Sequence, residues 1–251
     1  MQAYSSFSIN FQKYLRSLSQ AKYRKKLKRY IAEGDKICQW IISYKPEEIE
    51  YLICTNNWYD SHISPRLSEN FNVIRIDEKT LKSFSQLSNG VQSMIIAYQN
   101  LKTFKDVLKP KFKAVYLDDV QDPGNVGAII RTAAWLNFDA VIRSIGSADY
   151  YNPKVIQSAM GSHVSISLVS QDIQKLPLQG INVVGTSLTG AEMDKNLDLG
   201  DQVIIVIGNE SKGMRESTRG LLTSRLLIPG DRSRAESLNA AVAFGIIASR
   251  I

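Results

Sequence analysis

Three segments in the second half of the chain combine amide, carboxylate, hydroxyl and guanidinium side chains with glycine-bearing turns. They are residues 118–136 (DDVQDPGNVGAIIRTAAWL), 203–214 (VIIVIGNESKGM) and 226–244 (LLIPGDRSRAESLNAAVAF). Each segment joins a strand-like apolar run to a turn that exposes backbone groups. In open α/β sheets, ligands bind at the carboxyl ends of the strands. The three turns are therefore expected to meet at one ligand site, although they are far apart in sequence.

The first segment places a proline–glycine break before a helix that carries a guanidinium group. Asn125 is in position to cap this helix, and Arg131 follows on it. With Gly124 and Gly127 near its start, the helix offers backbone N–H groups to phosphate or another anion. The alternative is that the break is only a turn with a cap and that Arg131 forms a surface salt bridge. The segment matches neither the phosphate-binding P-loop nor the GxGxxG dinucleotide fingerprint.

The second and third segments add a carboxylate, a hydroxyl and another amide. Gly208 at a strand end permits close approach of a ligand, and Glu210 offers a carboxylate to an amino group, a hydroxyl or an arginine. The alternative is a polar turn before a helix, with Glu210 near the positive end of that helix. In the third segment a helix is predicted to start at residues 237–239. Ser237 and Asn239 lie on different faces of it, so one caps the helix and the other points to a substrate.

The composition narrows the class of protein. Of the 251 residues 44% are hydrophobic, which suffices for a sizeable core, and the formal net charge is +7. The charge favours a polyanionic partner, with a solvated basic surface as the alternative. Cys38 and Cys54 are the only cysteines and lack a CxxC spacing, which favours buried reduced thiols over a disulfide or a metal site. No apolar run approaches the roughly 18 residues of a membrane span, and the amino terminus lacks the apolar core of a signal peptide. We therefore expect a cytoplasmic protein that binds neither metal nor membrane.

The elements that must position the three segments form a regular pattern after residue 113. Near-continuous apolar runs alternate with helical stretches, which indicates strands covered on both faces. This pattern predicts an α/β fold with an open, mainly parallel sheet. The expected strands are 114–120, 139–145, 163–169, 181–188, 202–210 and 225–230, and the expected helices are 125–137 and 153–160.

The first hundred residues are typical of a smaller α/β unit. Apolar spacing predicts a helix that begins near Gly34 or Asp35, with one face formed by Ile31, Ile37, Trp40 and Ile41. Short strands are expected at 51–55, 72–76 and 93–98, and a helix at 79–88. The polar, basic stretch 100–113 is the expected linker. We therefore predict two domains, 1–105 and 106–251.

The three segments together resemble the three motifs of the SpoU (TrmH) family of RNA ribose 2′-O-methyltransferases, within the SPOUT superfamily. The motifs agree in order and spacing, and they are NxGAIxRTA, GNExxGM and IPG…ESLNAAVA. The resemblance covers residues 114–251, and QSAMGSHVSI is similar to the intervening helix and strand of that family. Residues 22–98 resemble its accessory RNA-binding domain, which is related to a ribosomal protein fold. Two departures concern the third motif. The loop between Ile228 and Ser237 is about one residue longer than the commonest form, and Ala240 and Ala241 replace the usual Val-Ser.

The resemblance implies a fold, a cofactor and a set of site residues. It implies a carboxyl-terminal trefoil knot, an exception to the rule against threaded chains, that holds S-adenosyl-L-methionine through backbone groups. The cofactor-binding residues carried over are Thr186, Leu188, Gly208, Asn209, Ile228 and Leu238. A guanidinium is a poor base because its pKa exceeds about 12. Arg131 is therefore expected to bind the adjacent phosphate and to stabilise the developing alkoxide. Asn125 would orient Arg131 or the ribose, Glu210 would hold the arginine or the methionine amino group, and Ser237 with Asn239 would complete the site.

The resemblance also implies partners. RNA is the expected substrate, ribosomal RNA rather than transfer RNA, and the chain is expected to form a homodimer through its carboxyl-terminal helices. Tyr23 could stack on an unpaired base. The predicted phosphate contacts, with a solvated helix face as the alternative, are Lys22, Arg24, Lys25 and Lys26.

Two other functions remain open. One is a non-enzymatic RNA-binding or ribosome-assembly factor that retains the fold; the presence of Arg131, Asn125 and Asn239 argues against it. The other is a nucleotide-dependent oxidoreductase, against which the missing glycine fingerprint argues.

Overall fold

Two sheets organise the chain, one in each of two compact units. The computed structural model describes residues 6–87, 90–192, 199–231 and 233–251, without the side chains of 188–192. The first unit comprises residues 1–100 together with 151–164, and the second comprises 101–150 together with 165–251. Among the described helices, none combines the length and the apolar character of a membrane-spanning segment.

In the described part of the first unit, four strands form a mixed sheet in the order β1-β4-β2-β3. Strand β4 is antiparallel to β1 and β2, whereas β3 is parallel to β2. The strands are β1 (Arg29–Glu33), β2 (Ile49–Cys54), β3 (Asn72–Arg75) and β4 (Ser93–Tyr98). The helices are α1 (Ile9–Ser17), α2 (Ala21–Leu27), α3 (Asp35–Tyr44), α4 (Asn56–His62), α5 (Pro65–Ser68), α6 (Glu78–Lys82) and α9 (Pro153–Ala159), with short 3-10 turns η1 (Pro46–Glu48) and η2 (Ser162–Val164).

Helices cover both faces of this sheet. Phe11 and Leu15 of α1, with Leu18 after it, pack in one cluster with residues of β2. Helix α3 contacts β1 and β4, and α9 contacts β1. The residues that α3 buries follow a helical period and are Ile37, Cys38, Ile41 and Ile42. The predicted buried thiols are confirmed, since Cys38 and Cys54 are both free and buried.

Most elements predicted for the first unit are confirmed. Helix α3 begins at Asp35 after Gly34, whose φ of +99° favours glycine. The assignment of Ile31 to that helix was wrong, because Ile31 lies in β1 and Gly34 separates the strand from the helix. The predicted helix at 79–88 is limited to the short α6.

In the described part of the second unit, seven strands form a sheet in the order β11-β9-β10-β6-β7-β8-β5. Every neighbouring pair is parallel, which confirms the predicted parallel α/β fold. The strands are β5 (Leu101–Lys102), β6 (Phe112–Asp118), β7 (Ala140–Arg143), β8 (Ser167–Ser170), β9 (Asn182–Glu192), β10 (Gln202–Gly208) and β11 (Ser224–Leu227). The helices are α7 (Phe104–Val107), α8 (Pro123–Trp135), α10 (Glu216–Arg219) and α11 (Ala240–Ala248), with the turn η3 (Ile173–Lys175).

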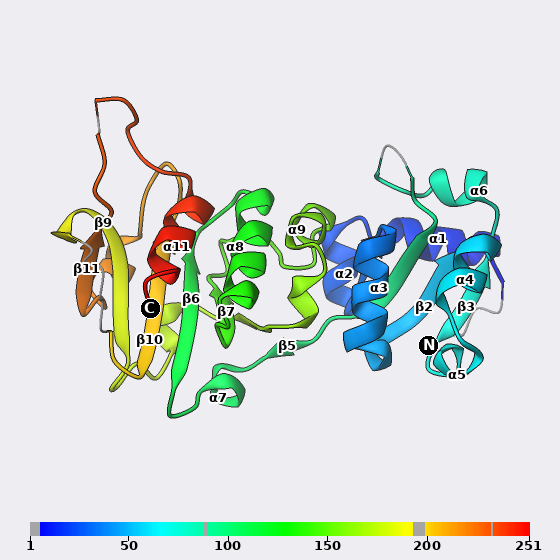
Figure 1. Cartoon of the computed structure of the whole chain (residues 1–251), viewed down its shortest axis with the longest axis horizontal. Helices are drawn as coiled ribbons and strands as arrows, with labels where there is room; N and C mark the ends of the chain where they lie inside the picture. The colour runs from blue at the N-terminus through cyan, green and yellow to red at the C-terminus, as the bar shows by residue number, and fades with distance from the viewer. Residues whose placement is uncertain (1–5, 88–89, 193–198, 232) are drawn as a thin grey trace. The chain divides into compact units, whose positions relative to one another are not determined.

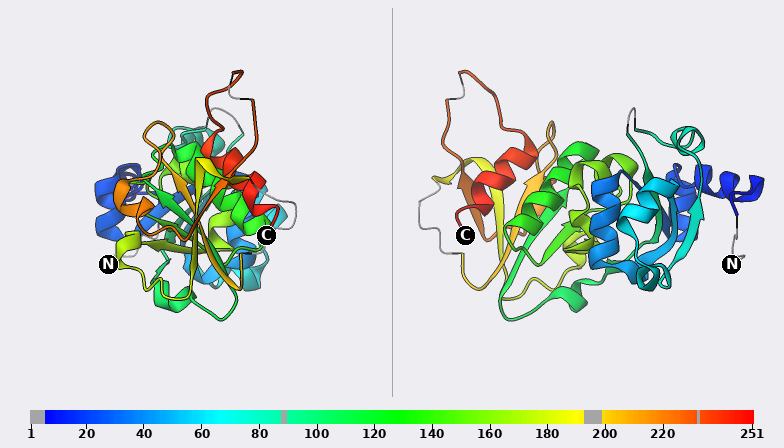
Figure 2. Two further views of the ribbon diagram at one scale, coloured as in Figure 1. Left: turned by 90° about the vertical axis from the view of Figure 1, so that its left-hand side faces the viewer. Right: turned by 45° about the vertical axis from the view of Figure 1, so that its right-hand side comes forward.

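Apolar residues cover this sheet on both faces, as its strand sequences predict. On one face, residues of α7, η3 and the α10 region form a cluster with alternate residues of β6, β7, β9 and β10. On the other, α8 contacts β6 and β7, and α11 contacts β10. Figures 1 and 2 show α8 and α11 side by side. A Cβ atom on Gly245 would lie 3.8 Å from Thr132, which places Gly245 on the side of α11 that faces α8.

The linker and one strand also differ from the predicted elements. The predicted linker 100–113 contains β5 and α7, and α7 begins with a capping box formed by Thr103 and Asp106. The predicted strand 163–169 is shorter, because His163 and Val164 form η2 in the first unit and β8 begins at Ser167. The boundary between residues 105 and 106 stays a prediction; the contacts also return residues 151–164 to the first unit.

His163 is buried in the first unit on a segment that returns from the second. Its Nε2 lies 2.9 Å from the hydroxyl of Tyr30 on β1, and its Nδ1 has no partner among the described residues. Burial lowers the pKa of His163 from 6.5 to about 3. The folded chain therefore keeps this imidazole neutral at pH values where the unfolded chain protonates it.

We predict that His163 makes the first unit sensitive to acid. The stability that neutral His163 contributes is complete above pH 6.5 and is lost as the pH falls toward 3, because the unfolded state then binds an additional proton. Between pH 7 and 5 the free energy of unfolding should therefore fall by about 2 kcal/mol more in the native protein than in His163→Phe, and the slope should approach about 1.4 kcal/mol per pH unit below pH 6. Urea unfolding at several pH values between about 7 and 5 measures both slopes. Equal slopes would show that His163 does not titrate on unfolding.

Candidate functional site

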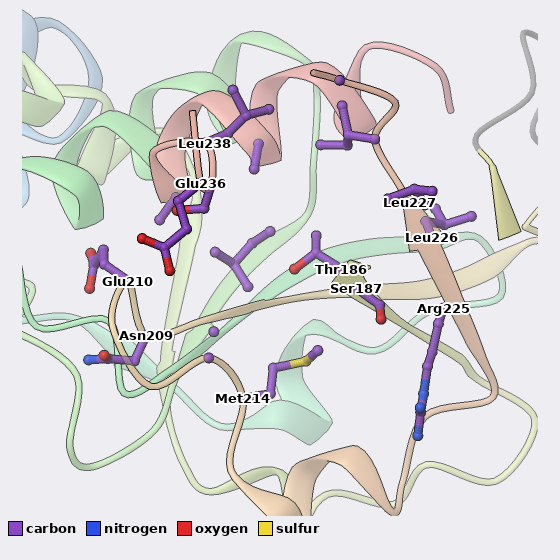
Figure 3. A pocket seen from close by; sticks show the side chains of 18 of the residues that line it. Thr186, Ser187, Asn209, Glu210, Met214, Arg225, Leu226, Leu227, Glu236 and Leu238 are labelled. Carbon is purple, nitrogen blue, oxygen red and sulfur yellow. The ribbon is translucent and has the colours of Figure 1, made fainter. Parts of the chain in front are cut away.

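The middle of β9 and the carboxyl ends of β10 and β11 border an open cavity of about 1330 Å³ (Figure 3). It contains residues from the second and third segments. The residues predicted to bind the cofactor that line it are Thr186, Gly208, Asn209, Ile228 and Leu238, and the predicted catalytic residues that line it are Glu210 and Ser237. The side chain of Leu188 lies outside the described residues.

Gly208 allows the turn after β10 to fold back over the strand end. A Cβ atom at this position would lie 2.6 Å from the backbone of Gly213 and Met214. The turn closes through two backbone hydrogen bonds between Asn209 and Gly213, of 3.1 and 2.9 Å. The close approach that the sequence assigned to a ligand is thus made by the chain itself, and a side chain here would displace a wall of the cavity.

Asn209 ties this turn to the end of β6. Its Oδ1 accepts hydrogen bonds from the N–H groups of Ser211 and Lys212, at 3.0 and 2.9 Å. Its Nδ2 donates to the backbone oxygen of Asp119 at 2.8 Å. The amide therefore shapes the turn from within and attaches it to the neighbouring strand, while the residue lines the cavity.

A buried ion pair fixes the other end of the turn. The Asp118 carboxylate at the end of β6 is fully buried, and it accepts hydrogen bonds from the backbone N–H and the Nε of Arg215, both at 2.7 Å. Arg215 also donates to the Tyr116 hydroxyl at 3.1 Å and to Asp172 at 3.4 Å. Burial alone lowers the pKa of Arg215, but the hydrogen bond and the negative charge of Asp118 raise it above its usual value. For Tyr116, by contrast, burial raises the pKa, to about 12.

One side chain from each of the three segments joins a chain of hydrogen bonds. Asn239 Nδ2 donates to Asn125 Oδ1, and Asn125 Nδ2 donates to Glu210 Oε1, both at 2.7 Å. Asn239 Oδ1 caps α11 by accepting from Ala241 and Val242. Because each amide accepts through oxygen and donates through nitrogen, the chain has one direction and ends on the Glu210 carboxylate. The predicted meeting of the three segments is confirmed.

The prediction that Asn125 caps α8 was wrong. Asp122 is the N-cap, and its carboxylate accepts from the N–H of Asn125 at 2.8 Å. The next N–H, on Val126, donates to the backbone oxygen of Asp122. This carboxylate takes the place of the predicted anion at the helix start, and it leaves the Asn125 side chain available to the site. Of the pair in the third segment, Asn239 caps, and the exposed Ser237 lines the cavity.

Arg131 does not line the cavity of its own chain. It is exposed on α8, and on an α-helix six residues place the side chain about 120° away from the direction of Asn125. Trp135, one turn further along the same face, is 88% exposed. Arg131 and Trp135 therefore form an exposed stripe on α8, apart from the face that carries Asn125.

The basic cluster of the first unit divides into surface and internal residues. Lys22, Lys25 and Lys26 on α2 are exposed. Arg24 is 3% exposed and donates to the backbone oxygens of Leu18 and Ser19 at 3.1 and 2.7 Å. Its assignment as a phosphate contact is corrected, because its guanidinium caps the end of the α1 region.

Charged side chains of both signs line the cavity. In Figure 3 the carboxylates of Glu210 and Glu236 lie on the side opposite Arg225, with Met214 between. Such a cavity can take a ligand with an apolar body, a cationic group and an anionic neighbour. No group of three potential metal ligands occurs among the residues that the structure describes.

Sequence reasoning missed Arg215 and Glu236. An aspartate pair that ends an apolar strand was a signal for the former, since a buried carboxylate requires a cationic partner.

Two family models match this chain. A family model described as the SpoU rRNA methylase family matches residues 113–249, and one described as an MRM3-like substrate binding domain matches 10–95. The 23S rRNA (guanosine(2553)-2′-O)-methyltransferase RlmP of Bacillus subtilis is 35% identical over 54% of this chain and 56% of its own length. The chain spans about half the length of such curated relatives.

Two solved structures match nearly the whole chain. A TrmH-family protein from Porphyromonas gingivalis is 29% identical, with a TM-score of 0.84 over 97% of both chains. An AdoMet-bound rRNA methyltransferase from Sinorhizobium meliloti is 25% identical, with a TM-score of 0.85 over 99% of this chain and 96% of that one.

We predict that Arg215→Ala destabilises the second unit. The substitution leaves the Asp118 carboxylate buried without its cation, which should cost about 3 kcal/mol of the free energy of unfolding. Urea unfolding measures the loss. Arg219→Ala is the matched control, because the ion pair of Arg219 with Glu216 is exposed and should contribute less than about 1 kcal/mol. Equal losses in the two variants would contradict the role of the buried pair.

Proposed function

The chain belongs to the SpoU rRNA methylase family, and on this basis we propose that it transfers a methyl group from S-adenosylmethionine to a ribose 2′-hydroxyl of RNA. The observation that carries the proposal is the hydrogen-bonded chain Asn239–Asn125–Glu210 beside the cavity. It joins the three segments whose motifs resemble that family. The rRNA 2′-O-methyltransferase among the relatives and the AdoMet-bound neighbour support the reaction and the cofactor.

The cavity fits such a cofactor. Apolar side chains of Leu226, Ile228 and Leu238 suit an adenine ring, and backbone groups of the Gly208–Asn209 turn suit its polar edge. The carboxylates of Glu210 and Glu236 suit the positive charges of the sulfonium and the amino group. Bound S-adenosylmethionine supplies a methyl group on a sulfur that leaves as a neutral thioether. Thr186 and the backbone at Leu188 complete the proposed contacts.

The residues of the chain have to position the ribose oxygen and to stabilise its charge as it loses a proton. Because the pKa of arginine exceeds about 12, Arg131 is a poor base. We assign to it the binding of the adjacent phosphate and stabilisation of the oxygen, while phosphate or water accepts the proton. Asn125 holds Glu210, and Ser237 and Asn239 close the site on the ribose side.

The position of Arg131 is the reason to propose a homodimer, in which this residue would reach the cavity of the partner chain. In the single chain Arg131 lies on the exposed stripe with Trp135, and α11 next to α8 exposes Val242. Exposed apolar residues on two adjoining helices are typical of a subunit interface. We propose that two chains pack through α8 and α11, so that Arg131 of one chain serves the cavity of its partner.

The first unit is proposed to hold the RNA. Its match to a substrate-binding model and the exposed Lys22, Lys25 and Lys26 support phosphate contacts. Ribosomal RNA is the proposed substrate, because the RlmP relative is a 23S rRNA enzyme, and transfer RNA is the alternative. The buried free thiols fit a reducing compartment such as the cytoplasm.

A carboxyl-terminal trefoil knot is proposed as well. Strand β11 is at the edge of the sheet, two strands away from β10, and the chain that follows returns to place α11 on α8 and β10. The segment between them therefore passes the ends of β9 and β10, as a threaded chain requires.

Transfer of labelled methyl groups tests the proposed activity. The purified protein, S-adenosylmethionine labelled in the methyl group and RNA from cells that lack the protein should give label at ribose 2′-oxygens. The Asn125→Ala variant should lose most of this transfer, because it interrupts the chain to Glu210. RNA binding without transfer by the native protein would favour the non-enzymatic RNA-binding or assembly factor.

We predict that Arg131→Ala abolishes transfer and leaves cofactor binding intact, because the proposed contacts of this guanidinium are with the RNA phosphate and the ribose oxygen and not with the cofactor. Mixed dimers test where Arg131 acts. Leu238→Asp blocks the cavity, so each variant alone should be inactive. Dimers that contain one chain of each variant keep one complete site, and equal mixing should restore about a quarter of native activity. No restoration, in mixtures shown to exchange subunits, would place Arg131 in the site of its own chain or outside the reaction.

A further inference from the structure

An exposed pair of stacked aromatic rings lies on α3 of the first unit. The ring centroids of Trp40 and Tyr44 are 4.6 Å apart, and their planes make an angle of 29°. Trp40 is 41% exposed and Tyr44 is 54% exposed. The two residues are one helical turn apart, so they form one stripe along the solvent side of the helix.

Packing of the core does not account for this pair. Helix α3 buries Ile37, Cys38, Ile41 and Ile42 against its sheet, whereas Trp40 and Tyr44 are half-exposed. A neighbouring segment of the same chain packs against the tryptophan. Gly161 has a φ of +88°, and a Cβ atom there would lie 3.1 Å from Trp40. The absence of a side chain at Gly161 lets the Trp40 ring pack closely against the backbone there, which supports the ring on one side.

Two other tyrosine rings of this unit, one exposed and one half-buried, differ from the pair. The face of Tyr98 is covered by the guanidinium of Arg29 at 3.5 Å, and that of Tyr59 by Arg75 at 3.6 Å. These arginines occupy the position that a stacked base would take. The outer face of Tyr44 continues a stack that has already begun, which is the geometry that unpaired bases use on proteins.

The charges along α3 favour an anionic partner. Lys36 is exposed one turn before Trp40 on the same stripe, and Lys45 directly follows Tyr44. The ion pair of Lys45 with Glu47, at 3.6 Å, is exposed, so a phosphate can compete for this lysine. Cations therefore flank the aromatic pair at both ends, as the backbone of a single strand requires.

We propose that Trp40 and Tyr44 form a stacking platform for an unpaired base of the RNA substrate, with Lys36 and Lys45 at the adjacent phosphates. This inference rests on the proposed function, because the match of residues 10–95 to a substrate-binding model is what makes RNA the partner. It adds the ordered pair on α3 to the expected stacking contact of Tyr23 on α2.

Binding of a fluorescein-labelled RNA hairpin with a single-stranded loop tests the platform, by fluorescence anisotropy without cofactor. Tyr44→Ala and the double variant Trp40→Ala/Tyr44→Ala should weaken binding by about tenfold or more, since stacking of one base contributes that much. The variant Trp40→Phe/Tyr44→Phe keeps both rings and should bind within about threefold of the native protein. The slope of affinity against salt should stay unchanged, because no phosphate contact is removed.

Heparin, a polyanion without bases, is the control ligand. Its affinity should be the same for the native protein and the alanine variants. Unchanged RNA affinity in Tyr44→Ala, which alters only a half-exposed ring, would overturn the platform, and so would an equal loss of RNA and heparin binding. Because the measurement needs no methyl transfer, its outcome is independent of the proposed activity. Normal RNA affinity together with normal methylation in these variants would remove the platform and leave the enzyme.

Discussion

The buried carboxylate of Asp118 sets the geometry of the site, because a charge without access to water requires a partner nearby. Arg215 is that partner, and it contacts Asp118 through both its backbone and its side chain. The two residues stand at the end of β6 and at the end of the turn that follows β10. Pairing them brings the second segment against the first, and the Asn209 bond to Asp119 fixes the other end of the same turn. The cavity wall between them has little freedom to move.

The structure also fixes the direction of the hydrogen-bonded chain Asn239–Asn125–Glu210. The oxygen of Asn239 is used by the first N–H groups of α11, so only its nitrogen can reach Asn125. Asn125 must then accept on its oxygen and present its nitrogen to Glu210. A helix cap in the third segment thereby determines which way an amide in the first segment points, and which carboxylate oxygen of the second remains for a ligand.

Much of this arrangement could be predicted from the sequence. Apolar runs give the parallel sheet, and parallel strands place their carboxyl ends at one edge, which suffices to predict that the three segments meet. The cap of α8 could not be assigned in this way, because Asp122 and Asn125 both satisfy the rule for helix caps. Arg24 illustrates a different limit. In a basic run the side chain that turns inward depends on tertiary contacts, here with the carbonyl groups after α1, and charge alone does not distinguish it from its exposed neighbours.

The return of residues 151–164 to the first unit has a consequence for how the chain can be divided. The polypeptide passes between the two units three times, near residues 100, 150 and 164, so no single cut yields two complete bodies. A fragment that ends near residue 100 would lack α9 and the imidazole beside Tyr30, and would leave one side of β1 bare. The complementary fragment would carry a helix without the surface that it covers. Evolution of this architecture by simple fusion at one junction would have faced the same difficulty, so the two units are better regarded as interleaved than as joined end to end.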